Sequence, residues 1–193
     1  MANLFAIHSV GQSLVTYLRN SYPSALQAAH PCDFRLLSTG ELATKSDFGT
    51  TLSLLLYRVT TDTHTRNVPR AAQGKVRLPL CLDLHYLLTV WADNALAEHV
   101  ILAWAMRQIH EHGTLGAADL SPEAEWDPAD VLQLIAAELT VDEMMRVWDE
   151  LDPPYRLSVG YVARVVRIDG LEVGTEVPVV ARRLIFTPQG NEP

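Results

Sequence analysis

Histidine and acidic side chains are the groups in this sequence that could bind a metal ion or move a proton, and a close group of them is His110-Glu111-His112. A zinc-binding helix carries two histidines four positions apart, so that both imidazoles lie on one face. Here the two histidines are only two positions apart, and on a helix they point in roughly opposite directions. A favourable interaction with the dipole at a helix C-terminus explains them better than a zinc site does.

A second group of possible ligands is a run of acidic residues with enough carboxylates for a calcium ion: Asp119, Glu123, Glu125, Asp127 and Asp130. The run lacks the spacing of an EF-hand loop. Its prolines fit an exposed loop better than a calcium site, and Trp126 is expected to anchor that loop. We therefore predict no metal site.

Asp83 and His85 lie two positions apart in an apolar segment, which places them on the same face of a strand. We expect them to form a buried hydrogen-bonded pair. An enzymatic alternative would combine these two residues with Tyr161 in a catalytic site.

Other catalytic and redox motifs are absent from the sequence. It contains no glycine-rich phosphate loop and no GxSxG nucleophile elbow. Cys32 and Cys81 match no metal or redox spacing and indicate two buried thiols. The sequence thus predicts no catalytic residue and no cofactor, and it favours a scaffold or interaction protein over an enzyme.

Two long apolar segments, Leu52–Asp62 and Leu80–Trp91, indicate the middle of a β-sheet. Strands with so few polar residues are usually covered on both faces by helices. The second segment leads directly into a predicted helix, Asn94–His112. The expected buried face of this helix is Ala97, Ile101, Trp104, Ala105 and Ile109.

Further elements follow from periodicity and from helix signals. Asn3–Asn20 is predicted to be a helix that ends at Tyr22-Pro23, and Thr140 with Glu143 has the spacing of a capping box. The buried face predicted for this second, short helix is Val141, Met144, Met145, Trp148 and Leu151. The remaining predicted strands are Phe34–Leu37, Leu157–Ile168 and Glu176–Phe186, and Val131–Leu139 is either a third core strand or a helix.

The order of these elements predicts the fold class. Strict alternation of strand and helix is missing, which disfavours a Rossmann-type sheet. We predict a single α/β (α+β) domain with a mixed β-sheet, packed by an N-terminal helix, a central long helix and a short third helix.

Composition restricts the possible partners and location. The chain has 193 residues and a formal net charge of −8, without the basic balance of a nucleic-acid-binding protein. It contains no apolar stretch long enough to span a membrane, and its first residues do not resemble a signal peptide. We expect a soluble, cytoplasmic protein that binds neither nucleic acid nor membrane.

Thr63–Arg77 is a polar stretch that contains arginine and lysine but no acidic residue. It is either an exposed loop or a basic contact patch on an acidic protein. The sequence alone does not decide between these two interpretations.

Several segments together resemble a known protein family. They are Leu52–Val59 (LSLLLYRV), Arg66-Asn67, Leu78–Ala92 (LPLCLDLHYLLTVWA), Ala105–Leu115 (AMRQIHEHGTL) and Tyr155–Ile168 (YRLSVGYVARVVRI). In these segments the chain resembles the cap, or tail-terminator, proteins of extracellular contractile injection systems. The resemblance extends from the N-terminal helix to about Phe186.

The resemblance implies a structural, non-enzymatic cap domain over residues 1–186 with a C-terminal tail over 187–193. The cap would form a ring, expected to be a hexamer, that ends the inner tube and the sheath and joins them. It would assemble in the cytoplasm and then belong to a released, extracellular particle. The partner-binding residues expected on the basic stretch and the last strand are Arg66, Asn67, Arg70, Lys75, Arg182 and Arg183. The alternative is an adaptor domain of the same particle that binds a baseplate or cargo-loading protein.

Overall fold

The structure is a computed structural model that describes residues 2–44, 47–61, 70–72, 75–77, 79–151 and 154–168. In chain order its elements are α1 (Ala6–Ser21), α2 (Ser24–Ala29), β1 (Asp33–Leu37), α3 (Thr39–Thr44), β2 (Thr51–Thr61), β3 (Arg70–Ala72), β4 (Lys75–Arg77), β5 (Leu80–Trp91), α4 (Ala95–Glu111), β6 (Thr114–Gly116), the 3-10 turns η1 (Ala117–Asp119) and η2 (Pro122–Ala124), β7 (Val131–Ala136), α5 (Val141–Asp149) and β8 (Ser158–Ile168).

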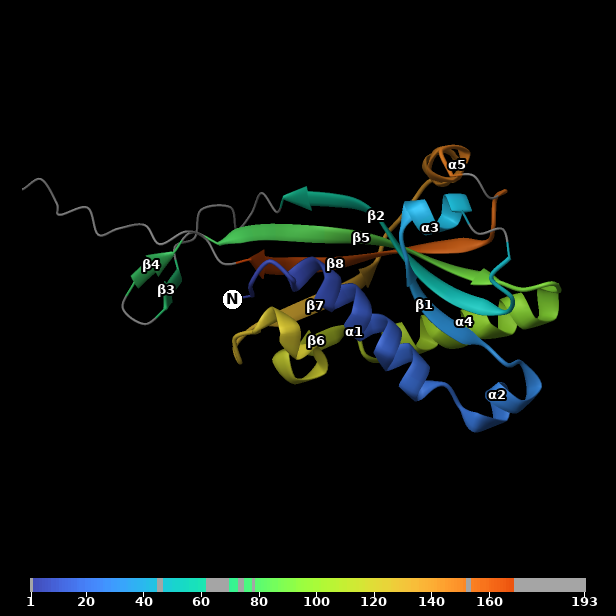
Figure 1. Cartoon of the computed structure of the whole chain (residues 1–193), viewed down its shortest axis with the longest axis horizontal. Helices are drawn as coiled ribbons and strands as arrows, with labels where there is room; N and C mark the ends of the chain where they lie inside the picture. Colours follow the sequence, from blue (N-terminus) through green and yellow to red (C-terminus); the bar gives the residue numbers. More distant parts are fainter. Residues whose placement is uncertain are drawn as a thin grey trace, which may run out of the picture.

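The long apolar strand β5 lies inside a six-stranded sheet with the strand order β1-β2-β5-β8-β7-β6 (Figure 1). β1 pairs in parallel with β2, and the other neighbouring strands of this sheet pair antiparallel. β3 and β4 form a separate two-stranded sheet. The predicted α+β domain with a mixed sheet is therefore confirmed.

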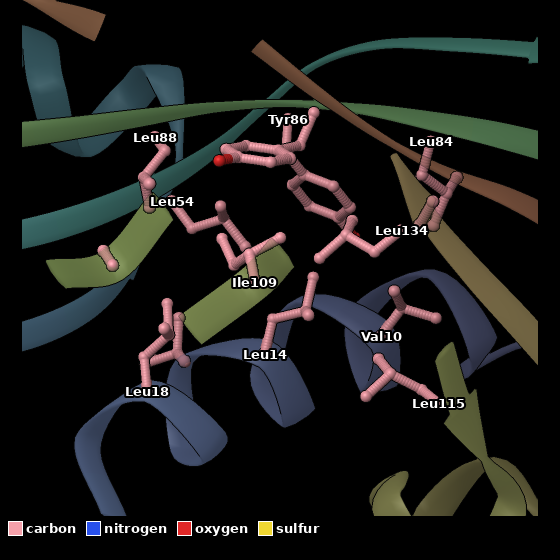
Figure 2. Close-up of a cluster of buried hydrophobic side chains, with 14 of the residues drawn as sticks. Val10, Leu14, Leu18, Leu54, Leu84, Tyr86, Leu88, Ile109, Leu115 and Leu134 are labelled. Carbon is pink, nitrogen blue, oxygen red and sulfur yellow. The ribbon is translucent and has the colours of Figure 1, made fainter. Parts of the chain in front are cut away.

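One face of the sheet carries the larger hydrophobic core, against α1 and α4. Alternate residues of β5, including Leu84, Tyr86 and Leu88, point to this face and are fully buried. Val10 and Leu14 project from α1 toward them, as Figure 2 shows. The helical spacing of the apolar residues in α1 and α4 produces this packing, and all five residues predicted to face inward from α4 are buried.

The opposite face of the sheet carries a smaller core beneath α3 and α5 (Figure 1). Leu87 and Trp91 of β5 point to this face and contact a cluster that includes Phe48 and Trp148. The ring centroids of Trp91 and Trp148 are 6.1 Å apart in an edge-to-face arrangement. Both faces of β5 are thus covered, as its composition predicts.

Side chains cap the starts of two helices, and the sequence predicts the cap at Thr140. The Asn94 side chain accepts a hydrogen bond of 2.9 Å from the backbone amide of Ala97 and begins α4. At α5, the Thr140 hydroxyl accepts from the Glu143 amide, and the Glu143 carboxylate accepts from the Thr140 amide at 2.9 Å. This reciprocal pair satisfies amide groups that a helix N-terminus leaves free.

Two predicted buried faces are wrong in part. In α5 only Trp148 is buried, whereas Val141 is 75% exposed and Met145 is also exposed. A single short helix over part of the sheet face leaves its outer residues in solvent. β7 is a strand, but it is half-buried rather than a core strand: Leu132 and Leu134 are buried, and Ile135 is exposed. β7 lies near the edge of the sheet, where only one face is covered.

Short elements account for the remaining differences. The sequence predicts neither the six-residue helices α2 and α3 nor the strand β6, which precedes the acidic run. Elements of this length carry too few periodic positions to be recognised from sequence. The predicted strand Glu176–Phe186 and the boundary between a domain at 1–186 and a tail at 187–193 lie outside the described residues.

Replacing Leu88 tests the central position of β5. Leu88→Ala is expected to lower the free energy of unfolding by about 2–5 kcal/mol, because it opens a cavity in the larger core. Leu96→Ala is the matched control on α4, where the side chain is 67% exposed, and should change stability by less than about 0.5 kcal/mol. Urea unfolding measures both; equal effects would contradict the assigned core.

Candidate assembly surfaces

Asp83 and His85 do not form the predicted hydrogen-bonded pair. Asp83 Oδ1 accepts a hydrogen bond of 3.1 Å from the backbone amide of Val165. His85 Nε2 lies 3.0 Å from the hydroxyl of Thr60. Residues two apart along a strand are separated by roughly 7 Å, whereas directly opposed cross-strand neighbours lie about 5 Å apart. Both side chains therefore bond to groups on neighbouring strands.

Asp83 stabilises an irregularity in β8. The register between β5 and β8 shifts between Leu82 and Leu84, and Val165, in this part of β8, has a φ of 64°. A β-branched residue is strained in this conformation. The bond from the Val165 amide to the Asp83 carboxylate holds the bulge in place, which gives this half-buried acid a structural role.

The enzymatic alternative needed Tyr161 beside Asp83 and His85, and the sheet separates them. Tyr161 is directly opposite Tyr86, and His85 is opposite Val162. Because opposed residues in antiparallel strands point to the same face, Tyr161 belongs to the larger core and His85 points to the other side. The three side chains form no common site.

Two residues of the acidic run also have structural partners. Asp119 accepts a hydrogen bond from the Gly116 amide, and Asp130 accepts one from the Asp127 amide, so these acids fasten turns. The indole of Trp126 donates to the Ser9 hydroxyl at 2.9 Å and anchors the acidic stretch to α1, as predicted. Among the described residues, no group of three or more histidine, cysteine or acidic side chains is arranged to hold a metal ion.

The thiols and the histidine motif show no reactive arrangement. Cys32 and Cys81 are both buried thiols, as predicted. Burial raises the pKa of the Cys32 thiol to about 11, which keeps it protonated near neutral pH. The ring of His112, just past the end of α4, packs against Tyr17 with 5.4 Å between ring centroids.

Grooves and exposed apolar side chains are the features of the described surface that can bind another chain. A groove of about 810 Å³ lies between α3, α5 and β2, with Leu55, Tyr57 and Leu151 in its lining. A second groove, of about 540 Å³, lies where α1 approaches the end of β1. A third, of about 510 Å³, lies between the end of α4 and β7.

The residues predicted to bind partners fall largely outside the described part of the chain. Arg66, Asn67, Arg182 and Arg183 lie outside it. Arg70 and Lys75 lie in β3 and β4, where Arg70 is opposite Arg77 and Ala72 is opposite Lys75. The polar stretch thus contains two short paired strands rather than only a loop. Its role as a contact patch stays a prediction.

Membrane insertion was a further possibility for an exposed apolar surface. No helix within the described ranges is long and apolar enough to cross a lipid bilayer.

Comparisons with known proteins found a matching family and solved structures with a similar fold. The family described as the Pvc16 N-terminal domain matches residues 9–182. Two solved structures are similar in fold. The sheath/tube terminator of the extracellular contractile injection system PVC, in its extended state, matches 97% of this chain with a TM-score of 0.58 and 17% identity. The tube-terminating cap of the anti-feeding prophage AFP matches 94% of this chain with a TM-score of 0.51 and 18% identity. This chain spans 65% and 60% of their lengths. A comparison with curated proteins gave no match.

The environment of His85 makes stability depend on pH. Burial, and then the nearby Arg58 guanidinium, lower the pKa of His85, while Asp83 opposes the shift. The unfolded chain therefore binds a proton more readily than the folded protein, and stability falls as the pH drops through about 6.5, the ordinary histidine pKa. We expect the free energy of unfolding to decrease more between pH 8 and pH 5 in the unsubstituted protein than in His85→Gln. Equal decreases in urea unfolding would contradict this assignment.

Proposed function

The chain belongs to the Pvc16 N-terminal domain family, and we propose that it is a structural, non-enzymatic cap that ends a contractile injection particle. The observation that carries the proposal is the family match over residues 9–182, and the similarity in fold to two terminator caps supports it. Its partners would be the inner tube and the sheath. The cap would assemble in the cytoplasm of the producing cell and leave with the particle.

The cap would act as a ring, of six copies in this proposal, that joins the tube to the sheath. A terminator needs one surface that matches the last ring of a polymer and another that no further subunit can bind. Heterologous contacts that close into a ring supply identical binding surfaces around one axis. Exposed apolar residues at separate positions of the chain, such as Leu4, Leu96 and Val141, fit a domain with several contact surfaces.

The basic stretch would contact an acidic rim of the tube. Arg66, Asn67, Arg70 and Lys75 lie in this stretch, on a chain whose net charge is −8, so its charge is opposite to that of the body. Complementary charges orient a docking subunit before the apolar surfaces meet. Arg182 and Arg183 would contribute a second basic contact. Charge reversal at Arg66 and Arg70 that leaves assembly intact would remove the first contact from the proposal.

The length of assembled particles tests termination. Without this chain we expect tubes and sheaths of irregular length, or particles that lose the sheath, because nothing stops or secures the last ring. Electron microscopy of particles made with and without the chain measures the length distribution, and re-expression of the unsubstituted chain is the control. If particles of uniform length persist without the chain, it does not end the polymer, and the adaptor function replaces the cap.

A further inference from the structure

The outer edge of β2 is only partly covered. β1 pairs with residues Thr51 to Leu55 and then ends, while β2 continues to Thr61. From Leu56 to Thr61, β2 pairs with β5 on its inner side, with a bulge at Tyr57, and no strand of the described chain pairs with it on its outer side. Such an edge presents backbone amide and carbonyl groups that can pair with an added strand.

On the other side of the central strands, the corresponding edge of β8 is covered by the protein itself. β7 pairs with β8 only up to Arg164, so the last residues of β8 also extend beyond their neighbour. There Ala2 forms a parallel bridge with Ile168, and its amide donates a hydrogen bond of 3.1 Å to the Arg167 carbonyl. The first residues of the chain thus protect one edge, in contrast to the edge of β2.

An apolar surface accompanies the open edge on the α1 side of the sheet. The groove of about 540 Å³ begins where β1 leaves β2 and is lined by Leu36 and Leu56, with Leu4 at its rim. Leu4 is 86% exposed. Farther along the edge, Val59 is 43% exposed and stands opposite Leu84, which faces the α1 side. An added strand would place every second side chain over this surface.

We propose that the outer edge of β2 binds residues 176–186 of a second copy of this chain. The segment, EVPVVARRLIF, has the composition of a strand, and it follows the last described residue of β8, Ile168. Ile168 is opposite Leu80, and Thr61 is opposite Leu82, so β8 and β2 end at the same end of the sheet. The described chain therefore stops, at Ile168, at the end of the sheet where the open edge of β2 also ends.

Topology favours a second copy over the same chain. The seven residues 169–175 span at most roughly 25 Å, enough to cross the roughly 14 Å from β8 to a position outside β2. That path, however, would cross the connection from β2 to β5, which leaves the same end of the sheet. Connections at one end of a sheet do not cross each other. A neighbouring copy reaches the edge without such a crossing, and repetition around an axis closes a ring.

Disulfide trapping between two differently tagged chains tests the proposal, with Cys32→Ala and Cys81→Ala in both. One chain carries Val59→Cys, and the other carries a cysteine at one of the positions 178–182. After mixing and mild oxidation, we expect a covalent dimer of the two tagged chains at alternate positions of the segment, because neighbouring side chains of a strand point to opposite faces. The matched control is Ile135→Cys on β7, which has 42% exposure and should give at least about tenfold less product.

The outcomes separate this inference from the proposed function on which it rests. Equal yields at Val59→Cys and Ile135→Cys would overturn the strand exchange, and so would disulfides that form only when both cysteines are in one chain. The mass of the unsubstituted protein, measured by light scattering, reports the ring independently. If the unsubstituted protein forms rings but the Val59→Cys disulfide does not form, the proposed cap function stands and the strand exchange is wrong. Trapped chains that never close into a ring would support the exchange and contradict the ring.

Discussion

The two hydrophobic cores share one strand, β5, which is buried on both faces. Its alternating residues supply Leu84, Tyr86 and Leu88 to one core and Leu87 and Trp91 to the other. A strand covered on both faces must lie inside a sheet and requires a layer of helices on each side. α1 and α4 form one layer, and α3 and α5 form the other. The larger core holds α1 and α4 against the sheet. The smaller core attaches α3 and α5, whose outer residues remain exposed.

This division of the core leaves the surface available for assembly. The strands β2, β5 and β8 extend beyond β1 and β7, so the centre of the sheet is longer than its flanks. The two candidate catalytic residues on β5 have structural partners: Asp83 holds the bulge at Val165, and His85 contacts Thr60. The features left for binding are strand edges, grooves and exposed apolar side chains. These suit contacts with other protein chains, which a cap of a polymer requires.

Long, strongly patterned elements could be predicted from the sequence, and features that depend on neighbouring strands could not. The bounds of β5, the buried face of α4 and the capping box at Thr140 follow from local patterns, and the structure confirms them. The partners of Asp83 and His85 depend on register, which local spacing does not reveal. The exposure of Val141 and Ile135 depends on how far a neighbour covers each element. The open edge of β2 appears only when the length of β1 is compared with that of β2. The predicted contact residues in the basic stretch and the last strand remain predictions.

We propose that this chain occupies the end of the tube and sheath, so electron cryomicroscopy of the distal end of an intact particle is the decisive measurement. We expect one closed ring of this fold in contact with both the last tube ring and the last sheath ring. Density for this fold elsewhere on the particle, with a different protein at the end of the tube, would contradict it.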